Sequence, residues 1–589
     1  MADSIKSVSF AVSLFFISFA HLPLIAQSSS DVCPRPQAGS VVTEPEDLRS
    51  QNGVLEAELT ANNSANPDGS VRFCFTDGAG RESPNLRVSP GDLVILHLKN
   101  ALSNLPLPGP DSGTAPPAHI HSAMHDRKSG QASDPCNSEV MSAVSTNLHF
   151  HGLTIPPVCH QDEVLKTSIQ PGDAPFEYRF RIPDDEPPGL YWYHPHIHGF
   201  TKAPMLGGAS GALIVEGLER AKKAVAGLPE RVFIIRDQDL INPNAPPAKS
   251  EPVVPKFLVD RDGDATNTGT GFGKPAKDLS INYVPVPYPD YPPAVIQMKP
   301  GERQLWRVLN ASAITYLNLA VLFNRAPQPL ELVAMDGVPL SHNEPTGSSV
   351  DPQDHIGLPP GARAEFIVTG PAEGQAGLLV TRTVDTGAGG ENDPNRALAT
   401  IVPSASAPEP RSKLDGSPRP LAPSSTAWLG SVAPVRVRHL YFSEKLAVPN
   451  DPTSAVEFYL TVDGQEPKMF DMTSAIPDIV AQQGTVEDWI IENRSNELHA
   501  FHIHQMHFLL LDYNGRPVNE NFLRDTVNVP YYNGRALSYP SVRLRMDFRD
   551  PNMVGTFVYH CHLLEHEDKG MMGSIRVDPA SSAQTPVGK

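Results

Sequence analysis

The sequence predicts an all-β protein, and two features of the 589-residue chain lead to that fold class. The first is a repeat: a turn followed by a strand of β-branched and aromatic residues that ends at Asn occurs at 90–100, at 300–310 and, more loosely, at 483–493. The second is composition, because 61 prolines and 43 glycines, with few long stretches of helical periodicity, favour short strands and many turns. Three copies of one unit predict three similar β-domains.

The predicted organisation has more than one core, because the chain is too long for a single one. We expect a signal peptide at 1–26, a first domain at 40–216, a second domain at 228–405, a linker at 406–430 and a third domain at 431–580. The signal peptide is predicted from Lys6 in a short polar start, an apolar run from about Val8 to Ala20 and a small-residue site near Ala26. The run is too short for a confident membrane span, and an uncleaved anchor is the alternative. We therefore expect a secreted or periplasmic protein.

The net charge limits the classes of binding partner, and the cysteines indicate an oxidising compartment. The formal net charge of -19 favours solubility and disfavours nucleic acid or an anionic membrane as a partner. Four of the five cysteines, Cys33, Cys74, Cys136 and Cys159, fall in the first 160 residues, and in an exported protein we expect them to form two disulfides. Three pairings are possible, and the sequence does not choose among them. We expect Cys561 to stay unpaired.

The most informative motif of the chain surrounds Cys561. This cysteine lies between His560 and His562, with His566 five residues after it and Met571 ten residues after it. Because neighbouring side chains of a strand alternate between its faces, the cysteine would point one way and the flanking histidines the other. One Cys, two His and a weak Met are the ligands of a blue-copper electron-transfer site, for which a second His would come from elsewhere in the chain. The flanking histidines suit a second, nitrogen-rich copper cluster.

Three more histidine clusters supply the remaining candidate ligands. They share a His-x-His pattern, which puts two imidazoles on one face of a strand, as a polynuclear copper site needs. Their members are His149 and His151, His194 and His196, and His499, His502 and His504. A lone His-x-His is usually a pair of surface histidines. Four clusters that hold 10 of the 21 histidines, with the Cys and Met at fixed offsets, favour copper instead.

These four motifs resemble those of the multicopper oxidases, the family of laccases, bilirubin oxidases, ascorbate oxidase and their bacterial relatives, and the resemblance spans about 45–578. It implies three Greek-key β-sandwich or barrel domains of the cupredoxin type, in the bacterial three-domain arrangement. It also implies four copper ions: one type 1, one type 2 and a type 3 pair. The type 1 ligands would be His499, Cys561, His566 and the axial Met571, the type 2 ligands His149 and His502, and the type 3 ligands His151, His194, His196, His504, His560 and His562.

The repeat predicts where the trinuclear cluster of type 2 and type 3 copper lies. The segment 189–196 aligns with 555–562, and Pro195 takes the place of Cys561, so the first domain keeps trinuclear ligands without a blue site. The matching strand of the middle domain, 377–382, has no ligand. The cluster should therefore lie between the first and third domains, with the middle domain as a spacer and part of a substrate wall.

The resemblance implies that a reducing substrate gives single electrons to the type 1 copper and that O2 takes four electrons at the trinuclear cluster and becomes water. That reduction consumes protons, so nearby carboxylates are needed as donors. By position, Glu567 matches the proton-relay carboxylate of the bacterial family. Asp162 matches the acid after the first His-x-His motif, although the usual Asp-Gly is here Asp162-Glu163. For both carboxylates, a solvated surface acid is the alternative.

The electron donor has two candidate classes. The resemblance favours a laccase-like oxidation of phenols or aromatic amines near an exposed type 1 ligand, which we expect to be His499 or His566. The alternative is a metal-ion oxidase for cuprous, ferrous or manganous ions, because Glu497 lies two residues before His499 and an acid at that edge could bind a cation. The 13 methionines, without a Met-rich segment, disfavour the cuprous version.

Two further expectations concern binding. A copper-free or copper-storing protein on the same scaffold is an alternative from another class, which the intact ligand set disfavours. We otherwise expect a monomer whose partners are a small reducing substrate and O2. The run of His119, His121 and His125 is predicted to be a surface loop, with an extra metal site as the alternative.

Overall fold

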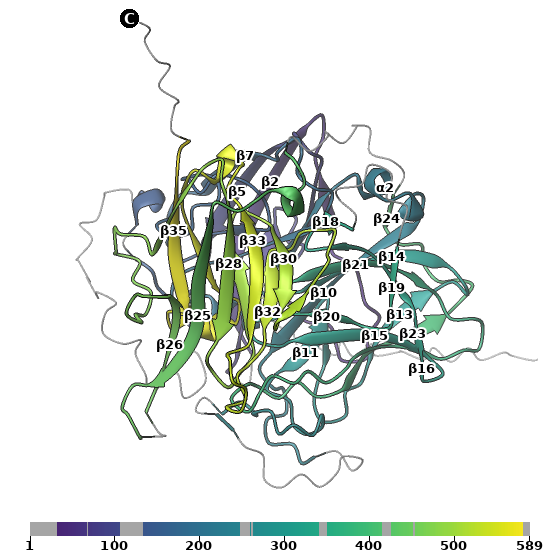
Figure 1. Ribbon diagram of the computed structural model, residues 1–589. Coiled ribbons are helices and arrows are strands. Elements are labelled where there is room, and N and C mark those ends of the chain that lie inside the picture. The colour runs from purple at the N-terminus through teal and green to yellow at the C-terminus, as the bar shows by residue number, and fades with distance from the viewer. Residues whose placement is uncertain are drawn as a thin grey trace, which may run out of the picture. The chain divides into compact units, whose positions relative to one another are not determined.

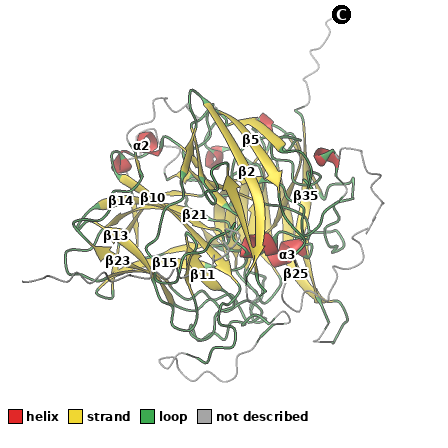
Figure 2. Cartoon of the chain, turned by 180° about the vertical axis from the view of Figure 1, so that it is seen from behind, coloured by secondary structure: helices red, strands yellow, loops and turns green. Residues whose placement is uncertain are grey.

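The computed structural model describes residues 32–66, 69–105, 134–138, 140–247, 259–260, 263–340, 350–414, 426–451 and 454–580. The predicted signal peptide and the histidines His119, His121 and His125 lie outside these residues. Within them, the regular structure is almost entirely β-strand and the helices are short (Figure 1, Figure 2), which confirms the predicted all-β fold class. No helix of the described chain has the length and apolar character needed to cross a membrane.

The first pair of sheets contains strands of the predicted first domain. One sheet has the strand order β3-β2-β5-β7 and the other the order β1-β4-β9-β8-β6. The strands are β1 Asp47–Arg49, β2 Val54–Ala65, β3 Val71–Asp77, β4 Asn85–Val88, β5 Leu93–Asn100, β6 His149–His151, β7 Phe176–Arg181, β8 Gly189–His194 and β9 Gly211–Val215. Burial alternates along β5 with the period of a strand, so Leu96 packs with Phe150 and Tyr193 in the core between the sheets.

The second pair of sheets contains strands of the predicted middle domain. One sheet has the order β12-β11-β10-β14-β21-β17-β18 with β19 and β24 at its side, and the other the order β13-β23-β22-β15-β16 with β20. The strands are β10 Pro229–Gln238, β11 Asp278–Ile281, β12 Val284–Val286, β13 Ala294–Met298, β14 Arg303–Asn310, β15 Leu317–Phe323, β16 Ala326–Gln328, β17 Leu330–Met335, β18 Val338–Pro339, β19 Asp351–Gln353, β20 Ile356–Leu358, β21 Arg363–Thr369, β22 Gly377–Thr381, β23 Arg396–Pro403 and β24 Ser412–Lys413. The last of these lies within the predicted linker and pairs with β10.

The third pair of sheets contains strands of the predicted third domain, with the orders β26-β25-β28-β33-β30-β31 and β27-β35-β34-β29-β32. Figure 1 shows β26, β25, β28, β33 and β30 side by side in this order. The strands are β25 Arg436–Leu446, β26 Val456–Val462, β27 Ile479–Gln482, β28 Val486–Asn493, β29 His499–Ile503, β30 Phe508–Tyr513, β31 Arg516–Pro517, β32 Thr526–Val529, β33 Ser541–Asp547, β34 Gly555–Cys561 and β35 Met572–Asp578. The helices are α1 Lys202–Leu206, α2 Leu218–Ala221 and α3 Leu564–Asp568, and the short 3₁₀ turns are η2 Pro135–Asn137, η3 Lys223–Val225, η4 Leu429–Ser431 and η5 Pro551–Met553. The exact boundaries predicted for the domains stay predictions.

The three sequence repeats occupy equivalent positions, as strands β5, β14 and β28. Each pairs in parallel with the first long strand of its sheet and antiparallel with a later one. The asparagine that ends each repeat is buried, and its side-chain amide donates to two backbone carbonyls of its own domain; the residues are Asn100, Asn310 and Asn493. A buried carbonyl needs a hydrogen-bond donor, which explains why the repeat ends at this residue type.

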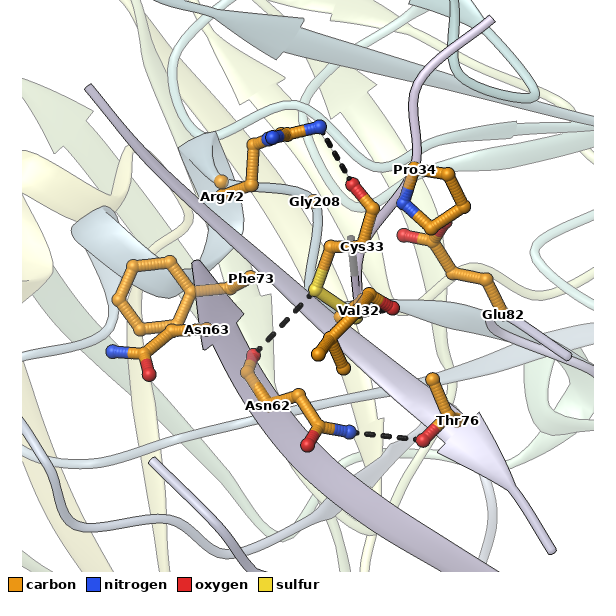
Figure 3. Close-up of a disulfide and its surroundings, with 12 residues drawn as sticks. Val32, Cys33, Pro34, Asn62, Asn63, Arg72, Phe73, Thr76, Glu82 and Gly208 are labelled. Carbon is orange, nitrogen blue, oxygen red and sulfur yellow. Dashed lines mark hydrogen bonds between the residues drawn. A yellow bond between two sulfur atoms is a disulfide. The ribbon is translucent and has the colours of Figure 1, made fainter. Parts of the chain in front are cut away.

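Two disulfides are present, as expected, and the structure selects one of the three possible pairings. Cys33 bonds to Cys74 on β3, and Cys136 in η2 bonds to Cys159. The first disulfide ties the segment before β1 to the first pair of sheets, where the backbone oxygen of Cys33 also accepts a hydrogen bond from Arg72 (Figure 3). Cys561 is unpaired and buried, as predicted.

Candidate copper centres

The strand pairing around Cys561 separates two groups of candidate ligands. Strand β34 pairs antiparallel with β29, so that Cys561 lies opposite Phe501 and His560 opposite His502. The sulfur of Cys561 gathers with two histidines on one side, whereas the flanking His560 and His562 join other histidines. This is the back-to-back arrangement expected from the alternation of side chains along a strand.

The first group is built from Cys561, His499 and His566. The sulfur of Cys561 lies 3.5 Å from His499 Nδ1 and 3.8 Å from His566 Nδ1, and these two nitrogens are 3.3 Å apart. Met571, which is fully buried, is fixed by its backbone, because its N–H donates to His566 O and its carbonyl accepts from Cys561 N–H. Burial raises the pKa of the Cys561 thiol, and a metal that binds the thiolate would offset that cost. One sulfur and two imidazole nitrogens suit type 1 copper.

The second group holds the remaining eight histidines, and the structure divides six of them into two sets of three. Within each set the candidate ligand atoms lie within 4.8 Å of one another. The sets are His151, His194 and His562, and His196, His504 and His560. His149 and His502 form a further set with His151, which therefore belongs to two sets. The resemblance implies that these six residues hold the type 3 pair together, without this division. Histidines of the first and third domains come together in both sets, as expected for a shared cluster.

The chemistry of these eight imidazoles fits copper. Burial, with the neighbouring imidazoles, lowers the pKa of six of them well below the usual value and that of His560 to about 3. Neutral imidazoles are the form that binds a metal. The Nε2 atoms of His149, His194 and His502 are buried without a hydrogen-bond partner in the described structure. Buried polar atoms are rarely left without a partner, and a bound metal would supply one.

The two carboxylates that were expected to assist oxygen reduction, Asp162 and Glu567, lie against histidines of the second group. Asp162 is buried, and both of its oxygens lie 3.0 Å from His149 Nδ1. Glu567 is fully buried, with one oxygen 3.1 Å from His560 Nδ1 and the other 3.5 Å from His196 Nε2. Burial, with the adjacent Asp568, raises the pKa of Glu567 well above its ordinary value. The alternative of a solvated surface acid is therefore wrong for both residues.

The outer edge of the first group differs from the expectation of an exposed histidine. His499 is 0 % and His566 3 % exposed. Their outward Nε2 atoms are covered, because that of His566 lies 3.0 Å from Glu497 Oε1 and that of His499 lies 2.8 Å from Ser495 Oγ and 3.3 Å from Glu444 Oε1. Carboxylates thus stand between both imidazoles and the solvent.

Sequence reasoning missed several residues around the candidate ligands. Glu444 on β25, Ser495 and Asp525, directly before β32, contact candidate ligands, and Arg363 at the start of β21 pairs with Asp525. Of these, only Ser495 lies near a ligand in sequence, and none belongs to a motif with fixed spacing. The weak signal for Asp525 is its place in Arg524-Asp525-Thr526, a charged pair directly before a buried strand.

Comparisons with known proteins agree with this geometry. Two models described as "Multicopper oxidase" match residues 140–220 and 442–581. The multicopper oxidase mco of Staphylococcus aureus is 24% identical over 444 residues, which cover 74% of this chain and 77% of that protein. The laccase of Bacillus subtilis is 24% identical over 466 residues, covering 74% of this chain and 80% of that one. The solved structure of a McoA multicopper oxidase variant from Aquifex aeolicus has a TM-score of 0.62 at 17% identity and covers 92% of this chain and 100% of that one.

Proposed function

The chain belongs to the multicopper oxidase family, an oxidoreductase family that uses oxygen and binds copper, and from that membership we propose its reaction. It couples one-electron oxidation of a small reducing substrate at the Cys561 site to four-electron reduction of O2 to water at the eight-histidine site. The observation that carries this proposal is the contact of Cys561 with His499 and His566 while His560 and His562 belong to the two sets of three histidines. One strand thereby connects both sites.

Copper bound at the two sites would supply the redox chemistry, taking electrons singly at one site and passing four to O2 at the other. The chain supplies the connection and the enclosure. His560 Nδ1 donates a hydrogen bond to the backbone oxygen of Cys561 at 3.0 Å, which adds a contact to the covalent path along β34. All eight histidines of the second site are at most 2 % exposed, so that bulk water is excluded from the place where O2 is reduced.

Protons for the reduction are proposed to arrive through Glu567. Its two carboxylate oxygens reach one histidine of the first domain and one of the third, so it touches the site across the interface. Asp162 is proposed to orient His149, since it accepts from that ring and from the backbone N–H of Phe150 at 2.8 Å. Glu567 would then supply protons, and Asp162 would position a histidine.

For the donor, the carboxylates at the type 1 edge support a metal cation. Both outward nitrogens face a glutamate, and neither imidazole has a surface against which a flat phenol could lie. Burial, with the negative charges of Glu444 and Glu391, raises the pKa of Glu497 well above its usual value. A cation bound among these groups relieves their mutual repulsion, whereas an anionic phenolate adds to it. The relative named laccase supports phenols and aromatic amines as the second candidate class.

Oxygen uptake tests both parts of the proposal. The copper-loaded protein is supplied with ferrous, cuprous or manganous ions, a phenol or an aromatic amine, with peroxide assayed in parallel. Water as the sole product is expected, and stoichiometric peroxide would contradict the role of the eight-histidine site. Glu444→Gln should lower kcat/KM for the metal ion about 10-fold or more and change the phenol rate less. A larger loss for the phenol would favour the laccase class.

We also propose that the protein is exported, to the periplasm or the medium. The predicted signal peptide and the two disulfides support this location, because disulfides persist in oxidising compartments. Amino-terminal sequencing of the mature protein should find a start near Ala26, and an intact Met1 in the functional protein would contradict export by cleavage.

A further inference from the structure

We propose that Arg363 and Asp525 are a positioning pair through which the middle domain sets the orientation of two copper-binding histidines. The inference rests on the proposed copper assignment and goes beyond it, because neither residue belongs to the candidate ligand set. Asp525 directly precedes β32 in the third domain, and Arg363 begins β21 in the middle domain. Both side chains are 0 % exposed, so their charges have to be satisfied within the protein.

The pair is held by two parallel contacts. Arg363 Nη1 lies 2.7 Å from Asp525 Oδ1, and Arg363 Nη2 lies 2.7 Å from Asp525 Oδ2. The same guanidinium donates through Nε to the backbone oxygen of Leu190 at 3.0 Å and through Nη2 to that of Asp336 at 2.9 Å. Leu190 belongs to β8 of the first domain. One arginine therefore joins all three domains, and its planar fork is the feature that lysine lacks.

Asp525 contacts two histidines with two different oxygens. Its Oδ1 lies 3.2 Å from His151 Nε2, and its backbone oxygen accepts from His502 Nδ1 at 2.8 Å. A carboxyl oxygen that also accepts from Arg363 and a backbone carbonyl oxygen are both acceptors, so each contact places the proton on the facing nitrogen. The opposite nitrogens, His151 Nδ1 and His502 Nε2, are left to bind a metal.

Those opposite nitrogens are the ones that the described structure leaves buried without a hydrogen-bond partner. A single residue thus selects Nδ1 on the candidate type 3 ligand His151 and Nε2 on the candidate type 2 ligand His502. The hydrogen bond made by one imidazole nitrogen determines which nitrogen the metal takes, and such partners typically contribute about 10- to 100-fold to metal affinity.

Two glycines next to the pair, Gly152 and Gly361, could not be replaced by a larger residue without a clash. A Cβ on Gly152, next to His151, would lie 2.4 Å from Arg363 Nη2 and 2.8 Å from Asp525 Oδ2. A Cβ on Gly361, two residues before Arg363, would lie 2.9 Å from His562 Nε2. The middle domain therefore reaches the histidine site itself, and its predicted role as a spacer is wrong in this respect.

The test compares Arg363→Lys with Arg307→Lys in the copper-loaded, full-length protein. Arg307 is a fully buried arginine of the neighbouring strand β14 that pairs with Glu230 and Glu365 rather than with Asp525. Electron paramagnetic resonance measures the type 2 signal during titration with a chelator, the visible band measures type 1 copper, and a thermal melt of the copper-free protein measures folding. Arg363→Lys should hold type 2 copper about 10- to 100-fold more weakly with the visible band retained, and Arg307→Lys should not.

Asp525→Asn keeps the shape of the side chain and removes its charge. It is measured in the same three assays and tests the proposal if Arg363→Lys does not fold. Wild-type retention of type 2 copper in the folded variant would overturn the proposal, as would an equal loss in Arg307→Lys. Failure of the proposed function is a separate outcome, because it would appear as missing type 2 copper in the wild-type protein.

Discussion

Burial determines what the acidic residues near the histidines can do. Asp162, Glu567 and Asp525 are each at most 1 % exposed and each contacts an imidazole nitrogen. An acid in that position interacts with an imidazole rather than with the solvent, because a buried carboxyl group is shielded from water. Their roles nevertheless differ, since Asp162 and Asp525 accept from ring or backbone N–H groups, whereas burial raises the pKa of Glu567 well above its ordinary value and favours its protonated form.

Replacing Glu567 with glutamine tests proton supply at the level of one residue. The change keeps the size of the side chain and removes the acidic proton, so reoxidation of the fully reduced protein by O2 should slow about 10²- to 10⁴-fold. The visible type 1 band should stay intact because Glu567 contacts the other site. Stopped-flow absorption measures both quantities. Glu565→Gln on the same helix α3, where Glu565 pairs with Lys202, is the control, and an equal slowing in both variants would remove Glu567 from the relay.

The candidate ligand residues could be proposed from the sequence, but several of their partners could not. The alternation of side chains along a strand is a local property, so the motif at Cys561 alone indicated two sites back to back. Asp525 lies 374 residues from His151 in the chain and has no spacing pattern that points to it. The exposed type 1 histidine was wrongly predicted for the same reason, because Glu444, which covers His499, comes from the distant strand β25.

At the scale of the elements, the turn before each repeat strand requires a glycine. Gly91, Gly301 and Gly484 have φ values of 81°, 69° and 89°, in the left-handed region that other residues avoid. Each is followed by a strand whose last residue is the buried asparagine. The turn, the strand and the asparagine at its end therefore form one structural unit. Because this unit occurs three times, three short sequence repeats were enough to predict the fold.

Another left-handed glycine, Gly361, gives a prediction with a matched control. Gly361→Ala should destabilise the protein by about 1–2 kcal/mol through backbone strain and should also weaken type 3 copper binding, because the new methyl group would press on His562. Gly301→Ala has similar strain, with φ of 69° and no atom within 4 Å of the added Cβ, and should lose stability alone. Thermal melts and copper-to-protein ratios separate the two effects. Full copper content in Gly361→Ala would contradict the close approach.

Glu186, in the turn before β8, gives a pH-dependent stability. Burial raises the pKa of Glu186 from 4.5 to about 8, so the folded protein binds this proton more tightly than the unfolded chain. Its stabilising contribution is therefore full below about pH 4.5 and is lost as the pH rises to about 8. Glu186→Gln removes the titration, so melting temperatures of the copper-free variant, relative to wild type, should rise between these pH values. Parallel curves for the two proteins would contradict the shifted pKa.

At the scale of the whole molecule, buried charges connect the first and middle domains. Glu230 on β10 accepts from Arg87 of the first domain at 2.6 Å and from Arg307 at 2.7 Å, and Glu365 accepts from the backbone of Leu190 at 2.8 Å. Removing one partner of such a network leaves an uncompensated buried charge, at a cost of about 3–5 kcal/mol. The sequence could predict three domains and a site shared by two of them, but not these contacts, because they join distant charged residues without a motif.

The central claim is that one cysteine connects a mononuclear site to a three-ion site shared by the first and third domains. A crystal of the copper-loaded protein, measured at the copper absorption edge, tests it most directly. We predict four anomalous peaks: one beside Cys561, His499 and His566, and three among the eight remaining histidines of the candidate set. Fewer than three peaks among those histidines, or a peak beside Cys561 that His499 and His566 do not share, would contradict the claim.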